Sequence, residues 1–123
     1  MFLFRRAFKA MACVAEIQIY ADQAAHASVA LDATQREVER IEAKYSRYRD
    51  DSVTTAVNRN AGGFSTPIDS ETSSLLDYAD TCWRQSDGLF DITSGVLRRV
   101  WDFKRAELPS HSAVGEADRK SVV

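Results

Sequence analysis

The stretch Ala15-Glu-Ile-Gln-Ile-Tyr20 alternates apolar and polar residues, as a half-buried strand does. An apolar stripe with three- and four-residue spacing follows, and it predicts a long helix that starts after Asp22 as its N-cap. A strand that leads into a long helix is therefore the element pair on which the fold is built. The stripe consists of Ala24, Ala27, Leu31, Thr34, Val38, Ile41 and Tyr45.

The sequence after this helix predicts further helices and little strand. A shorter helix is expected over 52–58, then a turn over 60–63 and a short extended piece over 64–68. Asp69 or Ser70 is expected to cap a third helix, which carries its apolar face on Leu75, Leu76, Ala79, Cys82 and Trp83.

A turn at Gly88 and a helix that begins near Ile92 complete the expected elements. Helices with few strands indicate the α+β class. Because one or two short strands do not form a stable sheet alone, we expect an incomplete sheet whose partner strands are missing from this chain.

Composition indicates one small globular domain. The chain has 123 residues, of which 45% are hydrophobic and 28% charged, and its mean hydropathy is −0.32. The formal net charge is −2, with acids and bases interspersed, so the sequence predicts no surface for nucleic acid or for an acidic membrane. No stretch is long and apolar enough to cross a bilayer.

The cysteines and histidines offer no metal pattern. Cys13 and Cys82 lie far apart, and with His26 and His111 they cannot assemble a zinc site. Two lone thiols indicate buried, reduced cysteines, and a disulfide between them is the less favoured alternative. In residues 1–10 the basic residues follow the apolar ones, which is not the order of a secretory signal, so a cytoplasmic location is expected.

The periodicity stops after Pro109, and residues 110–123 are expected to form an unstructured tail. The last six residues, Asp118-Arg-Lys-Ser-Val-Val123, match a translation of the opening of a widely used sequencing adapter, in a frame whose next triplet is a stop. We interpret residues 118–123 as a read-through artefact that truncates an open reading frame, with a natural disordered tail as the alternative. In either case they are expected to carry no function.

A candidate ligand-binding segment is Asp87-Gly-Leu-Phe-Asp-Ile-Thr-Ser-Gly-Val-Leu97, which precedes Trp101-Asp102-Phe103. It places two glycines, Asp91 and two hydroxyl groups at the start of a helix. Backbone N–H groups at a helix start attract anions, and glycine lets a ligand approach the backbone closely. The segment is therefore a candidate phosphate or cofactor lip, and an ordinary glycine turn before a capped helix is the alternative.

Three segments share their order and spacing with one known family. They are Phe8-Lys-Ala-Met-Ala-Cys-Val-Ala-Glu-Ile17, then Ile41-Glu-Ala-Lys-Tyr-Ser-Arg-Tyr-Arg-Asp-Asp-Ser52 with Asn58 downstream, and Gly88-Leu-Phe-Asp-Ile-Thr-Ser-Gly-Val-Leu97 with Trp101 and Phe103. Across residues 8–103 they resemble the motifs of the ApbE family, the FAD:protein FMN transferases. The sequence departs from those motifs at Ala12, Val96 and Asp102, where the family usually has glycine, proline and glycine.

The resemblance implies that residues 1–109 are the N-terminal portion of a single transferase domain with an ApbE-like, T-fold-like architecture. It places the FAD contacts on Met11, Tyr48, Leu89, Phe90 and Asp91. Met11 offers a polarizable surface to an aromatic ring, and Tyr48 can stack on a ring. Phe90 could line the pocket and Asp91 could accept hydrogen bonds from the ligand, with a core role and a helix cap as the respective alternatives.

The resemblance also implies a reaction. A threonine or serine hydroxyl of a target flavoprotein attacks the FMN phosphorus of FAD, which gives a phosphoester-linked FMN and releases AMP. The family's Mg²⁺ ligands have no counterpart in residues 1–123, so no catalytic or metal-binding residue is assigned here. We expect the chain by itself to be inactive and poorly folded, because its strands lack partners. The cytoplasmic location expected above differs from that of other family members, which are exported lipoproteins.

Two alternatives remain open at this point. The first is a small helical interaction module that uses the apolar stripe of residues 24–45 to bind a partner. The second is an FAD pyrophosphatase, which would hydrolyse FAD and release free FMN instead of transferring it.

Overall fold

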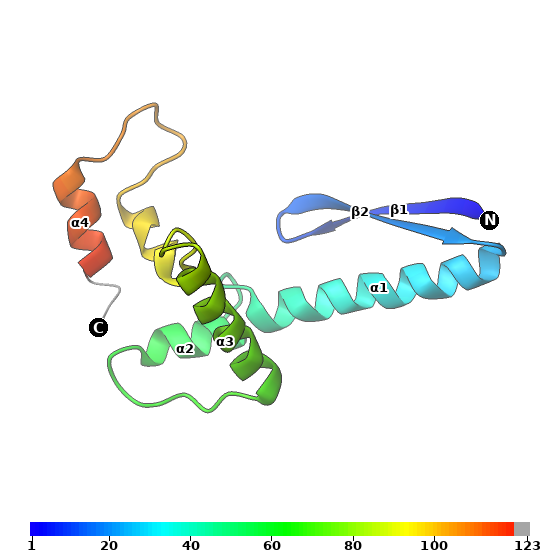
Figure 1. Ribbon diagram of the computed structural model, residues 1–123, viewed down its shortest axis with the longest axis horizontal. Coiled ribbons are helices and arrows are strands. Elements are labelled where there is room, and N and C mark those ends of the chain that lie inside the picture. The colour runs from blue at the N-terminus through cyan, green and yellow to red at the C-terminus, as the bar shows by residue number, and fades with distance from the viewer. Residues whose placement is uncertain (120–123) are drawn as a thin grey trace. The chain divides into compact units, whose positions relative to one another are not determined.

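The computed structural model describes residues 1–119, and the chain divides into two compact units at the boundary between Asn60 and Ala61. The first unit holds β1 (Phe2–Ala10), β2 (Cys13–Ala21), α1 (Ala24–Tyr45) and α2 (Val53–Asn60). The second holds α3 (Ser70–Gln85), the 3-10 helix η1 (Ile92–Arg99) and α4 (His111–Arg119), as Figure 1 shows. The expected α+β class is confirmed.

Strands β1 and β2 form an antiparallel hairpin that pairs from Phe2 with Ala21 to Ala10 with Cys13. Its two loop residues, Met11 and Ala12, have φ angles of 52° and 61°. Both angles lie in the left-handed region that the type I′ turn of a two-residue hairpin requires. Because a side chain makes this region costly, glycine at position 12 would be the relaxed choice and Ala12 is strained.

Strand β1 was not predicted from the sequence, and the strand at 13–21 therefore has a partner within this chain. The reason is Arg6, which interrupts the apolar alternation of Phe4 and Phe8 on the face of the hairpin that packs against α1. Arg6 is tolerated on this face because it forms an ion pair with Asp32 of α1. The extended piece expected over 64–68 is a loop, so it adds no strand to the sheet.

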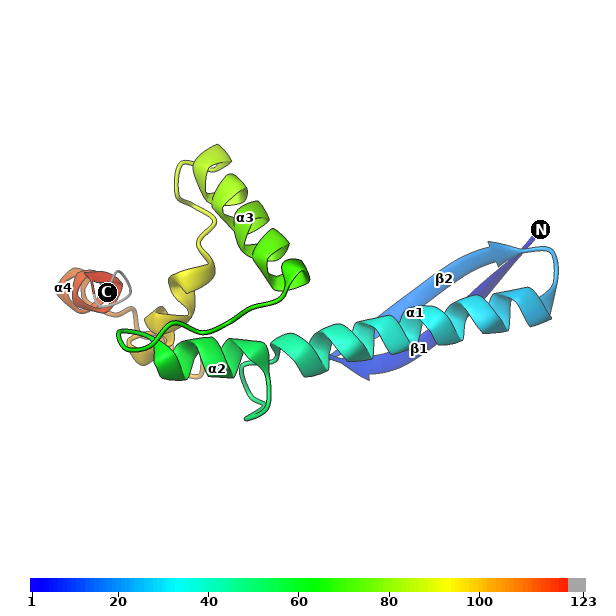
Figure 2. The ribbon, with the colours of Figure 1, turned by 90° about the horizontal axis from the view of Figure 1, so that it is seen from below.

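Helix α1 lies along one face of the twisted hairpin in both ribbon views (Figures 1 and 2). Ala27 and Leu31 of the apolar stripe are buried in this contact, with 1% and 6% of their surface exposed. The stripe is therefore used inside the chain, and it is not the free partner-binding face that the interaction-module alternative requires. The last stripe residues Val38, Ile41 and Tyr45 are half-buried, while Ala24 and Thr34 are exposed.

The N-cap of α1 is Gln23, whose side chain makes no capping hydrogen bond, so the expectation of Asp22 as the cap is wrong by one residue. The Asp22 carboxylate instead lies 3.1 Å from the ammonium group of Met1. Asp69 does cap α3 as expected, because its carboxylate accepts a hydrogen bond from the Thr72 N–H at 2.9 Å.

The turn after α3 depends on Gly88. Its N–H donates to the Trp83 carbonyl at 2.8 Å, and its φ of +79° lies in the left-handed region. A Cβ at this position would lie 3.3 Å from Nε1 of Trp83, so glycine also fits the indole. The helix expected near Ile92 is present, in the 3-10 form.

The expectation of an unstructured tail from residue 110 is wrong over 111–119, where α4 forms. Ser110 caps this helix, because its hydroxyl accepts from the Ala113 N–H at 3.2 Å. The helix packs against η1, and Ala117 is 8% exposed. Of the segment assigned to an artefact, residues 120–123 lie outside the described residues.

The cysteines differ in their surroundings, and both are free thiols. Cys82 is half-buried, but Cys13 is exposed, so the prediction of two buried thiols is wrong for Cys13. The position of Cys13 directly after the hairpin loop explains this exposure. Over residues 1–119 no helix combines the length and the apolar character needed to cross a membrane.

Candidate functional site

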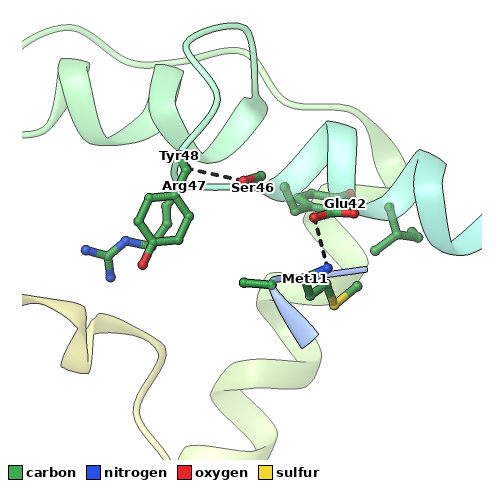
Figure 3. A pocket seen from close by; sticks show the side chains of 8 residues that line it. Met11, Glu42, Ser46, Arg47 and Tyr48 are labelled. Carbon is green, nitrogen blue, oxygen red and sulfur yellow. Dashed lines mark hydrogen bonds between the residues drawn. The ribbon is translucent and has the colours of Figure 1, made fainter. Parts of the chain in front are cut away.

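A pocket of about 370 Å³ lies in the first unit, where the hairpin turn meets the C-terminal end of α1 (Figure 3). This volume falls within the range of small-molecule sites. Met11 and Tyr48 both line it, so the structure brings together two of the residues predicted to contact FAD. The full lining is Met11, Ala12, Ile41, Glu42, Tyr45, Ser46, Arg47 and Tyr48.

The hairpin turn forms one wall of the pocket and is tied to α1 by a hydrogen bond. The backbone N–H of Met11 donates to Oε1 of Glu42 at 2.9 Å. Met11 is 56% exposed, so this residue is accessible to a ligand.

The opposite wall is the loop that follows α1. The Ser46 N–H donates to the Glu42 carbonyl at 2.9 Å and ends the helix, and the Ser46 hydroxyl accepts from the Tyr48 N–H at 3.3 Å. The exposed fraction of Tyr48 is 72%, so its ring is accessible to a ligand.

Helix α2 holds this loop in place. The Thr54 hydroxyl donates to the Tyr45 carbonyl at 2.8 Å, and the Thr55 hydroxyl donates to the Arg49 carbonyl at 2.6 Å. Ser52 is 2% exposed, and its hydroxyl accepts from the Thr55 N–H at 3.1 Å, so it caps α2. These bonds explain why serine and threonine recur in this segment.

Positive charge lies beside the aromatic rings of the pocket. The guanidinium carbon of Arg47 is 5.3 Å from the ring centroid of Tyr48, and the Lys44 Nζ is 5.3 Å from that of Tyr45. Arg49 is engaged with Asp51: their hydrogen bond, assisted by their opposite charges, raises the pKa of Arg49 and lowers the pKa of Asp51. Arg47 is therefore the arginine that the pocket offers to a ligand.

Leu89, Phe90 and Asp91 belong to the second unit, in the turn between α3 and η1. Leu89 is 92% exposed and Phe90 48%, so both apolar side chains are accessible. The Asp91 Oδ1 accepts from the N–H and from the hydroxyl of Thr93, each at 2.7 Å. Asp91 thus caps η1, which is the structural role considered for it.

Sequence reasoning did not single out Glu42, Ser46 and Arg47, although all three line the pocket. A signal was present, because Glu42 and Ser46 stand in the segment Ile41–Ser52 that carries the family resemblance. What could not be seen is that Glu42 reaches the hairpin, since that contact joins residues 31 positions apart in the chain.

The part of the chain that the structure describes contains no group of three or more His, Cys, Asp and Glu residues placed to hold a metal ion. Its donor set therefore does not fit a magnesium site, because Mg²⁺ needs several converging oxygen ligands.

Comparison with known proteins gives one consistent result. The model of the ApbE family matches residues 11–122. The chain is 28% identical over 117 residues to a protein named FAD:protein FMN transferase from Treponema pallidum (strain Nichols), which covers 93% of this chain and 32% of that protein. The chain therefore spans about a third of the length of this curated relative.

A solved structure shows the same fold. The fold resembles the crystal structure of the ApbE protein from Thermotoga maritima MSB8, with a TM-score of 0.77 and 24% sequence identity. The match covers 94% of this chain and 38% of that one.

Proposed function

Because the chain belongs to the ApbE family, we propose that it supplies the flavin-binding part of an FAD:protein FMN transferase. The observation that carries this proposal is that Met11 and Tyr48 line the same pocket. The isoalloxazine ring of FAD would lie against the Met11 thioether and stack on the Tyr48 ring. Arg47 would add a positive charge that suits the phosphates of the same ligand.

The turn between α3 and η1 belongs to the second unit and carries the other residues that we propose to contact FAD. Leu89 and Phe90 offer exposed apolar surface, and glycine at position 88 allows a close approach to the backbone. Asp91 would orient this turn through its cap on Thr93 and offer its carboxylate to ligand donors. Residues 1–109 remain proposed as the N-terminal portion of a single transferase domain.

The proposed reaction belongs to a protein of the relatives' length. A threonine or serine oxygen of the target flavoprotein forms a bond to the FMN phosphorus, and the bond from that phosphorus to the bridging oxygen of FAD breaks. AMP leaves with the bridging oxygen, and the proton of the attacking hydroxyl passes to the AMP phosphate or to water. No step is assigned to magnesium here, because the described donor set does not fit it. Magnesium dependence and a cytoplasmic location stay predictions.

A fluorescence titration of the chain with FAD tests the binding part of the proposal. We expect saturable quenching, and we expect Tyr48→Ala to raise the dissociation constant by about three- to tenfold because a stacked ring is lost. The matched control is Tyr78→Ala, since Tyr78 of α3 is 69% exposed against 72% for Tyr48. The proposal fails if the unmodified chain does not quench FAD or if both variants bind equally.

Product analysis tests the assignment of the reaction. The chain incubated with FAD, Mg²⁺ and a target flavoprotein should give neither covalent flavin nor free FMN. Covalent flavin would show that the chain carries the transfer chemistry itself, and free FMN would support the pyrophosphatase.

A further inference from the structure

Three hydrogen bonds form a continuous path between the two walls of the pocket, and Glu42 takes part in two of them. Its carboxylate accepts from the Met11 N–H at 2.9 Å, and its carbonyl accepts from the Ser46 N–H at 2.9 Å. The Ser46 hydroxyl then accepts from the Tyr48 N–H at 3.3 Å. Figure 3 shows the first of these bonds between Met11 and Glu42 and the third between Tyr48 and Ser46.

We propose that Glu42 is a positioning residue that fixes the separation of Met11 and Tyr48 and thereby the width of the pocket. The ligand part of this inference rests on the proposed function, while the positioning part rests on the hydrogen bonds alone. Glu42 acts through Met11, so it is not assigned to the chemistry of transfer.

The hairpin turn needs such an anchor. Met11 and Ala12 both have left-handed φ angles, and the Met11 N–H lies in the loop, outside the paired residues of the hairpin. A hydrogen bond to a carboxylate is stronger than one between neutral groups, so it can hold a strained turn against α1. Without it, the Met11 side chain would lose its fixed place on the pocket wall.

The path also explains the spacing of Glu42, Ser46 and Tyr48. Ser46 lies four positions after Glu42 because the backbone bond between them is the last helical i to i+4 bond of α1. Tyr48 lies two positions after Ser46 because a serine hydroxyl reaches the N–H two positions on. Glu42→Ala therefore removes the bond to the Met11 N–H, and Ser46→Ala removes the bond to the Tyr48 N–H, whereas Tyr48→Ala keeps the backbone N–H that takes part in the path.

Glu39 provides the matched control on the same helix. It is exposed, and its carboxylate accepts from the Gln35 side chain at 2.9 Å, within α1. Glu39→Ala therefore removes a glutamate of the same helix without touching the hairpin turn.

The test measures two properties of Glu42→Ala, Glu42→Gln and Glu39→Ala in the full chain. The first is the hydrogen-exchange protection of the Met11 amide by NMR, and the second is the dissociation constant for FAD. We expect Glu42→Ala to lower the protection and to raise the dissociation constant by about tenfold each. Glu42→Gln should recover most of both, because its amide oxygen can accept the same bond. Glu39→Ala should match the unmodified chain.

A double-variant cycle separates positioning from general destabilisation. If Glu42 acts through Met11, the effect of Glu42→Ala on FAD binding should fall to less than half in a Met11→Ala background. An undiminished effect in that background overturns the inference, as does an unchanged Met11 amide in Glu42→Ala. An equal loss of binding in the Gln and Ala variants also overturns it.

The two proposals fail in different ways. If the unmodified chain binds no FAD, the proposed function fails together with the ligand part of this inference. The amide exchange of Met11 in Glu42→Ala and Glu42→Gln then decides the positioning role by itself.

Discussion

Arg6 of the hairpin and Asp32 of α1 form an ion pair across the contact between the two elements. Arg6 stands between Phe4 and Phe8 on the inner face, and the two charged side chains are 30% and 47% exposed. A charged side chain that is partly buried loses hydration, and an ion pair offsets this cost. Removal of one partner therefore destabilises the folded state, because the other charge stays partly desolvated without a partner. The pair therefore helps to join the hairpin to the helix.

Asp32→Ala is expected to lower the free energy of unfolding by about 1–2 kcal/mol, because it leaves the Arg6 guanidinium half-buried without its partner. Replacing both residues, as Arg6→Leu with Asp32→Ala, should recover part of this loss. The control is Glu37→Ala, whose pair with Arg40 is more exposed and should contribute less than about 0.5 kcal/mol. Chemical denaturation measures all three, and equal losses at Asp32 and Glu37 would contradict the interpretation.

Ala12→Gly is expected to stabilise the chain by about 1 kcal/mol. The φ of 61° at Ala12 is unfavourable for alanine because of its Cβ, whereas glycine adopts it without this cost in free energy. Ala7→Gly is the control, because Ala7 is an exposed β1 residue with an ordinary extended backbone, and the change there should destabilise by about 0.5–1 kcal/mol. Thermal unfolding compares the two, and a loss of stability in Ala12→Gly would show that the turn is not strained.

Gly88→Ala is expected to destabilise the second unit more than Gly62→Ala. Both glycines have left-handed φ angles, +79° and +76°, so the backbone cost of about 1 kcal/mol is shared. A Cβ at Gly88 also meets the Trp83 indole at 3.3 Å, whereas one at Gly62 meets nothing within 4 Å. The difference in unfolding free energy isolates the Trp83 contact. No difference between the variants would mean that the indole moves aside freely.

The pKa of Asp51 responds to Arg49. The hydrogen bond from Arg49 lowers this pKa, so the folded state binds the proton less tightly than the unfolded chain. The stabilisation is therefore present above the ordinary pKa of about 3.9 and is lost as the pH falls through the lowered value. Because both side chains are exposed, we expect a small effect on stability and a clear effect on titration.

An NMR titration of the Asp51 carboxyl checks this prediction. Arg49→Gln should raise its midpoint toward the ordinary value. Arg59→Gln should leave it in place, because Arg59 pairs with the neighbouring Asp50 at 2.8 Å. An unchanged midpoint in Arg49→Gln would rule out Arg49 as the cause.

The sequence predicted the elements whose signals are local. Helix α1 ends at Tyr45 as the apolar stripe indicated, and Asp69 caps α3 as its position before the helix indicated. Such features depend on residues within one or two turns, so periodicity and capping rules suffice to find them.

Helix α4 was missed although its cap is local. Serine at 110 is an ordinary capping residue, but the segment that follows lacks a clear apolar stripe. Helix α4 is buried where it contacts η1, and the sequence of α4 alone does not predict this contact.

The residues of the candidate site also divide into those that the sequence indicated and those that only the structure revealed. Met11 and Tyr48 were named from motifs, and the pocket is where both lie. Their contact with FAD stays a prediction. The role of Glu42 could be found only in three dimensions, since its partner Met11 lies on another element.

The sequence by itself determined the α+β class, the extent of α1 and the family motifs, because each depends on the spacing of residues that lie close together in the chain. The tertiary structure decided that β1 pairs with β2, that Arg6 faces inward toward Asp32 and that Glu42 holds the Met11 turn. These three depend on contacts between residues far apart in the chain. These contacts stabilise the fold only once the hairpin and α1 have packed together, so no local sequence pattern predicts them.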